Sequence, residues 1–418
     1  MAKTFTAAVV VVIFCLQPLM GYSVLSHEAL VDALWGAKLR AILLSRFPNA
    51  TPEDLKQAHG FAYGGAIIQD LGYYPHGSTK FSDLTHYVRT GDFVVALFQE
   101  AHGLNDLAFA LGALSHYVSD LDGHRYGTNV GEPLLYPKLR KKFGNVITYE
   151  DDPLAHLKTE FGFDVLQVAR GNFAPQAYHD FIGFYVAKDL LQRAFHDTYG
   201  LELADLFGDF DLAINSYRSA VSRTIPMATR VAWSMKKNEI RRTHPGQSRR
   251  KFVYLMKRSS YRREWGKRDE PSKWERFLGF LLRLLPPIGP LKALGFKMPT
   301  PPAERLFMVS FERATDRYSQ TLAEAGNQAF QLDDENYDVG MPTPAGVYRL
   351  NDETQAFWLH QLAVKKFATV TPAIRQELLA FYNDPNASIQ AKQKTPKVWR
   401  QTMAELQELR SQNIATHE

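Results

Sequence analysis

Eight histidine and acidic residues, together with one tyrosine, are candidates for a metal centre in the first 160 residues. They are Tyr22, His27, Asp70, His86, His116, Asp120, His124, His156 and Glu160. Imidazole and carboxylate groups that face one another from several helices suit a cluster of zinc ions, whereas a hydrophobic helical core otherwise excludes them. We therefore expect this part of the chain to enclose divalent cations.

Two of these side chains lie four residues apart on a strongly apolar segment. His116 and Asp120 belong to the segment 105–121, which has hardly any polar face and is therefore predicted to form a buried helix. A spacing of four places both side chains on one side of that helix, and an ionised buried aspartate is costly unless it is paired or binds a metal. His156 and Glu160 repeat this spacing on a later predicted helix.

The other candidates have alternative interpretations when each is taken alone. Asp70 lies near the end of a predicted helix, where the helix dipole calls for a cation, either a metal or an Arg or Lys side chain. His86 alone would be a core histidine bonded to a carbonyl, and His27 alone a surface residue at a helix start. The pair His102 and Asp106 has the same spacing of four, but we interpret it as a capping feature.

Helical periodicity extends from Ser26 to Trp233 and predicts an all-α fold with at most minor strands. Helix starts are predicted at Ser26, Thr51-Pro52, Ser82-Asp83, Asn105-Asp106, Asp152-Pro153 and Ala174-Pro175. Gly60, Gly64 and Gly65 lower helix propensity, so we expect them to allow close approach of a neighbouring backbone.

The first 21 residues have the parts of a secretory signal, namely Lys3, the apolar run 7–16 and a cleavable region up to Ser23. A short membrane anchor is the alternative, but the run falls short of the roughly 20 apolar residues that span a bilayer. We expect an exported, periplasmic or extracellular protein. The only cysteine, Cys15, lies in this run, so the mature protein would contain no disulfide and no cysteine nucleophile.

The net charge of +5 is unevenly distributed, because the stretch from Lys236 to Arg276 contains 15 Lys or Arg and only 5 Asp or Glu. We treat residues 236–300 as a basic and amphipathic segment that follows the helical domain 22–235. It is either a solvated surface or, through residues 236–296, a docking surface for anionic lipid, with nucleic acid less favoured. The run Phe277 to Leu285 is too short to span a membrane; we expect a helix whose apolar face closes the core, with an interfacial role as the alternative. No protein partner is indicated.

Residues 301–418 form the last predicted region, with helices at roughly 303–330, 353–366, 371–384 and 394–412. A turn-rich gap separates the first two of them, from about Asp333 to Gly346. This region offers no chemistry that the sequence identifies.

Taken in order, the candidate residues resemble those of the bacterial zinc-dependent phospholipase C family and of the related fungal single-strand nucleases. The matching segments are Tyr22 to His27, Gly65 to Asp70, Asp83 to His86, His116 to His124, and His156 to Glu160. The resemblance implies a multi-helix bundle of that family, here with a helical C-terminal extension. It also implies up to three zinc ions in one cluster.

Carried over position by position, the resemblance implies one zinc ion bound by Asp70, His86, His116 and Asp120. His124, His156 and Glu160 would bind a second ion. A third would be bound by His27, by Asp120 as a bridging carboxylate, and by the amino and carbonyl groups of the mature N-terminal residue, Tyr22. Signal cleavage between Gly21 and Tyr22 would free that amine, and cleavage after Ser23 is the competing possibility.

The chain departs from the family pattern at His124, because the interval from Asp120 is shorter than usual and the interval to His156 is longer. Asp122 could replace His124 if the loop after the helix turns differently. Tyr22 also stands where the family usually has tryptophan. This replacement keeps the backbone ligands and alters the side chain that packs against the substrate.

Clustered zinc polarises a phosphoryl oxygen and activates water, so the resemblance favours hydrolysis of a phosphoester. Asp70 is the candidate general base, with proton acceptance by the metal-held hydroxide as the alternative. Phospholipase C type cleavage is favoured over a single-strand nuclease or nucleotidase, because the segment after the cluster lacks an obvious aromatic pair for stacking a base. A non-catalytic, exported protein stabilised by zinc, binding a membrane or a partner, is the alternative of another class.

Overall fold

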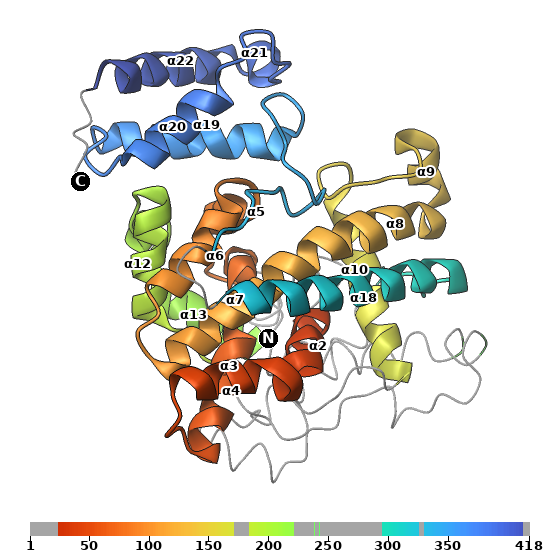
Figure 1. The fold of residues 1–418 in the computed structure, drawn as a ribbon. Helices are drawn as coiled ribbons and strands as arrows, with labels where there is room; N and C mark the ends of the chain where they lie inside the picture. The colour runs from red at the N-terminus through yellow and green to blue at the C-terminus, as the bar shows by residue number, and fades with distance from the viewer. Residues whose placement is uncertain are drawn as a thin grey trace, which may run out of the picture.

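The computed structural model describes residues 24–170, 184–220, 295–325 and 330–412, together with residues 238 and 242. In this part of the chain the secondary structure is helical without strands, which confirms the prediction of an all-α fold (Figure 1). The helices, with η for short π or 3-10 helices, are α2 (Val24–Leu34), η1 (Trp35–Leu39), α3 (Arg40–Arg46), α4 (Pro52–Gly65), η2 (Ile68–Tyr73), α5 (Thr79–Tyr87), α6 (Thr90–Gln99), α7 (Leu104–Gly123), η3 (His124–Thr128), α8 (Asn129–Leu135), α9 (Pro137–Phe143), α10 (Pro153–Arg170), α12 (Lys188–Tyr199), η4 (Leu203–Asp205), α13 (Phe210–Ser219), α18 (Pro301–Glu324), α19 (Arg349–Val364), α20 (Pro372–Phe381), α21 (Ala391–Lys394) and α22 (Pro396–Ser411).

Helix α7 is the buried centre of the fold, as its apolar sequence predicts. Every residue from Ala108 to Gly123 is buried. Helix α4 packs directly against it, because a side chain on Gly65 would overlap the carbonyl oxygen of Phe109 and one on Gly112 would overlap that of Ala62. A side chain on Gly64 would overlap the Tyr185 carbonyl in the same way. The predicted close backbone approach is confirmed at Gly64 and Gly65.

The predicted helix starts are only partly correct. Thr51 caps α4 in a reciprocal capping box with Asp54, and the Asp152 carboxylate accepts a hydrogen bond from the Ala155 amide at the start of α10. Ser26 and Ser82, in contrast, lie inside α2 and α5.

Both serines bond to partners outside their own helices. The Ser26 hydroxyl donates to Asp164, whereas the Ser82 hydroxyl accepts from the Gly72 amide and donates to the Gln69 carbonyl. Helix α7 begins at Leu104, one residue before the predicted Asn105-Asp106 start. The Ala174-Pro175 start and most of the basic segment 236–300 lie outside the described residues.

The C-terminal helices extend the hydrophobic core. Helix α18 packs against α7, η3 and α8. Its Phe307 ring also stacks on the Phe163 ring of α10, at 4.7 Å between centroids. Helices α19 to α22 lie together at one end of the molecule (Figure 1). They are joined to the rest by the Trp358 indole, which donates to the Tyr199 carbonyl at 2.8 Å. The four helices predicted here are present, although α18 ends at Glu324.

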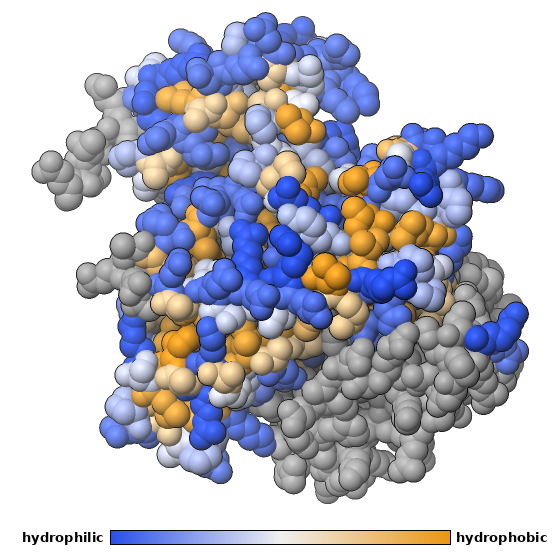
Figure 2. Space-filling model, turned by 45° about the vertical axis from the view of Figure 1, so that its right-hand side comes forward, coloured by the Kyte–Doolittle hydropathy of each residue, from blue (hydrophilic) through white to orange (hydrophobic). Residues whose placement is uncertain are grey.

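On the face shown in Figure 2, hydrophilic side chains predominate over the C-terminal helices, and apolar side chains form small groups among hydrophilic ones. Among the helices that the structure describes, none combines the length and the apolar character that crossing a bilayer requires.

Candidate metal centre

Five elements bring the predicted ligands together in the interior. Helix α2 carries His27, η2 carries Asp70, α5 carries His86, the α7–η3 junction carries His116, Asp120 and His124, and α10 carries His156 and Glu160. All eight are buried. Asp70 lies within η2 and not at the end of α4, so its expected position at a helix terminus is wrong; α4 already ends at Gly65. Tyr22 lies outside the described residues.

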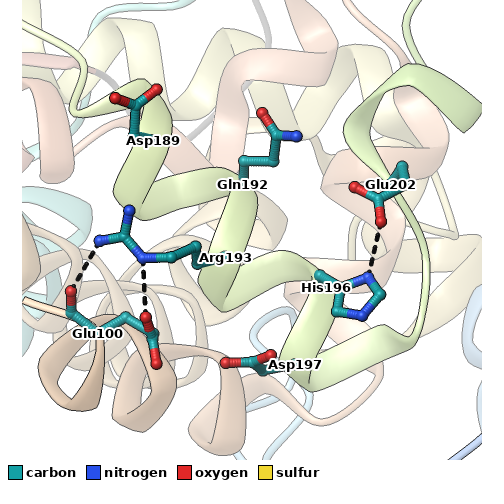
Figure 3. A pocket seen from close by; sticks show the side chains of 7 residues that line it. All are labelled: Glu100, Asp189, Gln192, Arg193, His196, Asp197 and Glu202. Carbon is teal, nitrogen blue, oxygen red and sulfur yellow. Dashed lines mark hydrogen bonds and ion pairs between the residues drawn. The ribbon is translucent and has the colours of Figure 1, made fainter. Parts of the chain in front are cut away.

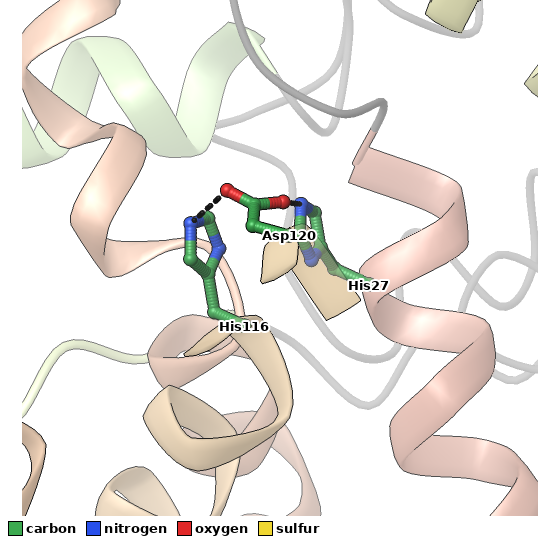
Figure 4. Close-up of side chains that lie close together, drawn as sticks. All are labelled: His27, His116 and Asp120. Atoms are coloured by element: carbon green, nitrogen blue, oxygen red, sulfur yellow. Dashed lines mark ion pairs between the residues drawn. The ribbon is translucent and has the colours of Figure 1, made fainter. Parts of the chain in front are cut away.

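Asp120 lies at the middle of the cluster, with imidazoles on both sides of its carboxylate. Its Oδ2 is 3.0 Å from His116 Nε2 and 3.6 Å from His86 Nε2, whereas its Oδ1 is 3.4 Å from His27 Nε2. Figure 4 shows His27 and His116 approaching the two carboxylate oxygens from α2 and α7. Asp70 completes this side of the cluster, with Oδ1 3.3 Å from His86 Nε2. This geometry allows Asp120 to be shared between two ions.

Glu160 organises a second group of ligands. Its Oε1 is 3.0 Å from Nε2 of His124 and 3.0 Å from Nε2 of His156. His124 also points toward the first group, because its Nε2 is 3.9 Å from Asp120 Oδ1. The two groups therefore lie next to each other.

His124, and not Asp122, joins the cluster. His116, Asp120 and His124 follow one another at intervals of four residues and share one side of the helix. The Asp122 carboxylate lies 3.8 Å from the Arg317 guanidinium instead. The chain then continues as the π-helical turn η3, and such turns are frequent at functional sites.

The outer ring nitrogens of the histidines are fixed by hydrogen bonds that orient the inner ones. Nδ1 of His86, His116 and His124 bonds to the backbone carbonyls of Ser82, Ala66 and Tyr337 at 2.8, 2.9 and 3.0 Å. A carbonyl only accepts, so each Nδ1 carries the proton and donates it. In the neutral ring, each Nε2 then keeps a lone pair that faces the cluster, as a metal ligand must.

His27 and His156 are oriented by side chains. The Ser119 hydroxyl donates to the His116 carbonyl at 3.1 Å and therefore accepts from His27 Nδ1 at 2.6 Å. His156 Nδ1 faces the buried Glu132 carboxylate at 3.7 Å. Glu132 was not predicted as part of this site.

The electrostatics of the cluster favour bound cations. Burial lowers the pKa of His27 well below its usual value, and the neighbouring His116 lowers it further. Burial alone would raise the pKa of Asp120, but His116, His124 and His27 lower it below its usual range. Despite burial, Asp120 and Glu160 raise the pKa of His124 to about 10. Burial raises the pKa of Asp70 against the opposing effect of His116 and His86.

The donor set fits zinc. Buried atoms that make no hydrogen bond include Nε2 of His116 and His156, Oδ1 of Asp70 and Asp120, and both carboxylate oxygens of Glu160. Three sets of ligand atoms lie within 4.8 Å of one another: His27, His116 and Asp120; Asp70, His86 and His116; and His124, His156 and Glu160. Tetrahedral zinc with bonds of about 2.1 Å places its ligand atoms about 3.4 Å apart, which is close to the separations in the cluster.

The comparisons agree with this chemistry. Residues 26–208 match the family model described as zinc dependent phospholipase C. Over these residues the chain is similar to that family. No curated protein and no solved structure matches the chain. The similarity supports a zinc-dependent hydrolase of phosphoesters, and the clustered His, Asp and Glu side chains are positioned to bind the metal.

A small pocket of about 20 Å³ reaches the candidate metal centre. Every described ligand candidate except His27 and His116 lines it, together with Tyr73, Tyr149, Leu157 and Asp338. The sequence did not single out these four residues. Tyr73 follows Asp70 closely and could have been suspected, whereas Asp338 lies in the turn-rich gap far beyond the family match and had no recognisable signal.

A more open pocket lies on the surface of α12 (Figure 3). Its charged side chains largely pair with one another. Arg193 binds the Glu100 carboxylate at 2.8 Å, and His196 Nδ1 lies 2.8 Å from a Glu202 oxygen. This pocket shares no residue with the pocket at the candidate metal centre, and its groups do not converge on a common point.

Proposed function

We propose that the protein is a phospholipase C that uses up to three zinc ions to hydrolyse a phospholipid at the bond between the glycerol oxygen and phosphorus. The observation that carries the proposal is the position of the Asp120 carboxylate. One of its oxygens faces His27 and the other faces His116, and the group around Glu160 lies beside it. The proposed ligands are those predicted from the sequence, with Tyr22 as the N-terminal ligand.

Zinc ions bound here would supply Lewis acidity toward a phosphoryl oxygen and would activate water. The chain's own groups then hold and orient the reactants. Asp70 lines the pocket, and burial raises its pKa, so it is suited to accept the proton of the attacking water. Asp120 and Glu160 offer negative charge to the cations, and the pocket of about 20 Å³ is lined by both ligand groups. A position beside the metal that a water molecule can occupy is typical of catalytic zinc sites, whereas structural sites are closed.

The test is metal analysis of the mature protein followed by assays with defined phospholipids and with nucleotides. We expect stoichiometric zinc and release of diacylglycerol together with a phosphorylated head group. Inorganic phosphate should alter the absorption spectrum of the cobalt-substituted protein, because a catalytic site has an exchangeable position. A zinc protein whose spectrum ignores phosphate and which cleaves no ester would support the non-catalytic alternative. A purified protein without zinc would contradict both.

A single-strand nuclease or nucleotidase is a second candidate, which one observation favours. Tyr73 and Tyr149 line the pocket with their ring centroids 6.5 Å apart, and aromatic rings beside a metal centre can stack a base. The same assays separate the two functions, because a nuclease would cleave oligonucleotides and leave phospholipids intact.

We further propose that the protein is exported and that cleavage after Gly21 frees the Tyr22 amine for the third ion. The basic segment 236–296 is proposed to bind anionic membranes. Neutralising Arg249, Arg250 and Lys251 together should lower binding to vesicles rich in anionic lipid in a salt-sensitive manner. Unchanged binding would indicate that this segment is only a solvated surface.

A further inference from the structure

A segment far outside the family match lies against the metal centre. The Tyr337 amide donates to the His86 carbonyl at 3.0 Å, and the Tyr337 carbonyl accepts from His124 Nδ1 at 3.0 Å. One residue of the C-terminal region therefore contacts a histidine of each ligand group. The family match ends at residue 208, so these contacts come from outside the matched region.

The segment is firmly anchored on the domain. The Asp334 carboxylate accepts from the Gly91 amide at 2.9 Å, and Glu335 binds the Arg317 guanidinium at 2.6 Å. The Thr90 hydroxyl donates to the Glu335 carbonyl at 2.7 Å. These contacts place the following residues at the metal centre with little freedom to move.

Asp338 is held in one orientation from several sides. Its Oδ2 accepts from the Tyr87 hydroxyl at 2.9 Å and from the Tyr348 hydroxyl at 2.5 Å. Its backbone amide donates to Asn336 Oδ1, and its carbonyl accepts from the Asn129 amide group. The other carboxylate oxygen, Oδ1, lies 3.8 Å from His124 Nδ1. Asp338 is 3% exposed, so this charge acts where solvent screens little.

We propose that Asp338 is a positioning residue that, with the Tyr337 carbonyl, orients the His124 imidazole for the zinc ion of the Glu160 group. This inference rests on the proposed function. A negative charge behind the protonated Nδ1 makes Nε2 a stronger ligand and favours the ring orientation that faces Glu160. The carboxyl group of Glu132 lies in the corresponding place behind His156, 3.7 Å from its Nδ1.

The test is the Asp338→Asn variant of the full mature chain, which keeps the shape and removes the charge. We expect the affinity of one zinc ion, measured by competition with a chelator, to fall about ten- to hundredfold, while the other ions stay bound. The cobalt-substituted variant should show an altered absorption spectrum for that ion alone, which a merely structural role would not produce.

Glu335→Gln is the matched control, because it removes a charge from the same segment and breaks the ion pair with Arg317 without facing a ligand. It should leave zinc affinity and the cobalt spectrum unchanged. Tyr348→Phe keeps the carboxylate and removes one of its two phenol donors, so it should weaken the same ion to a smaller extent, and it decides the question if Asp338→Asn does not fold.

Unchanged zinc affinity in folded Asp338→Asn, or in Tyr348→Phe where that variant decides, would overturn the inference. Equal losses in Glu335→Gln and Asp338→Asn would also overturn it, because the effect would then come from docking of the segment. A wild-type chain that binds no stoichiometric zinc would instead overturn the proposed function, and that result is read without any variant.

Discussion

At the scale of single residues, Asp120 differs from the other candidates because each of its two carboxylate oxygens faces a different set of imidazoles. Its two oxygens face imidazoles from different elements, and those imidazoles lower its pKa, so it stays ionised in a dry interior. The neighbouring Asp122 has the same chemistry and a different environment, because it faces Arg317. The pair therefore offers a matched experiment.

Asp120→Asn should lose zinc and reduce turnover by more than about a hundredfold, because even the loss of an outer-shell partner costs ten- to hundredfold. Asp122→Asn should keep both zinc content and rate. Metal analysis and steady-state assays of the two variants measure this difference. Loss of zinc in Asp122→Asn with retention in Asp120→Asn would reverse the assignment.

Zinc affinity of the Glu160 group should rise with pH. In the metal-free protein, Asp120 and Glu160 raise the pKa of His124 to about 10 despite burial, so the ring carries a proton at neutral pH that zinc must displace. The association constant should rise about tenfold per pH unit between pH 7 and 9, measured by chelator competition. An affinity that stays constant over this range would contradict the expectation.

The raised pKa of His124 has the opposite effect on the stability of the metal-free fold, which falls as pH rises. Because the folded-state pKa of His124 is raised to about 10, the charged ring stabilises the folded state fully below about pH 6.5, its ordinary pKa, and this contribution is lost as pH rises through about 10.

The order of the residues and the family resemblance predicted the eight ligand candidates that the structure brings together, whereas residue type and spacing alone left other interpretations for His27, Asp70 and His86. The sequence could not predict Glu132, Tyr149 or Asp338. A carboxylate or tyrosine becomes part of such a site only through the path of the chain, and Asp338 reaches His124 across more than 200 positions. Local patterns carry no information about that path.

At the scale of elements, the α4–α7 contact depends on backbones that approach without side chains between them. Helix positions were predictable from apolar periodicity, but helix starts were not always so. Ser82 has a favoured capping side chain and still lies inside α5, because its hydroxyl bonds to Gln69 and Gly72 of a different element. Residue preference at a cap is therefore overridden by tertiary partners.

Gly65→Ala should destabilise the fold by about 1–3 kcal/mol or more, because the added methyl group would overlap the Phe109 carbonyl. Gly36→Ala is the control, since nothing lies within 4 Å of its added methyl group. It should be neutral or stabilising by up to about 1 kcal/mol. Chemical denaturation of the zinc-loaded variants measures both, and equal stabilities would argue against the close helix contact.

At the scale of the whole molecule, the candidate metal centre joins helices from the first half of the chain, and the non-helical segment around Tyr337 in the second half lies against it. Removing zinc should leave several like charges and unpaired polar atoms in the interior, so a strong chelator should lower the melting temperature, and added zinc should restore it. An unchanged melting temperature in chelator would contradict the proposed centre.

Export is tested at the same scale. N-terminal sequencing of the mature protein should find Tyr22 first, because its free amine is the proposed ligand of the third ion. Val24 as the first residue would remove Tyr22 from the ligand set and leave the other two groups intact.

Protein synthesis delivers the parts of this centre in a fixed order. His27 to Glu160 leave the ribosome early, whereas Tyr337, whose carbonyl holds His124, is made after three quarters of the chain. The newly made N-terminal portion therefore lacks the support that fixes one of its imidazoles. Final assembly of the candidate metal centre is thus a late event, and a chain interrupted before this point lacks the Tyr337 carbonyl that orients His124.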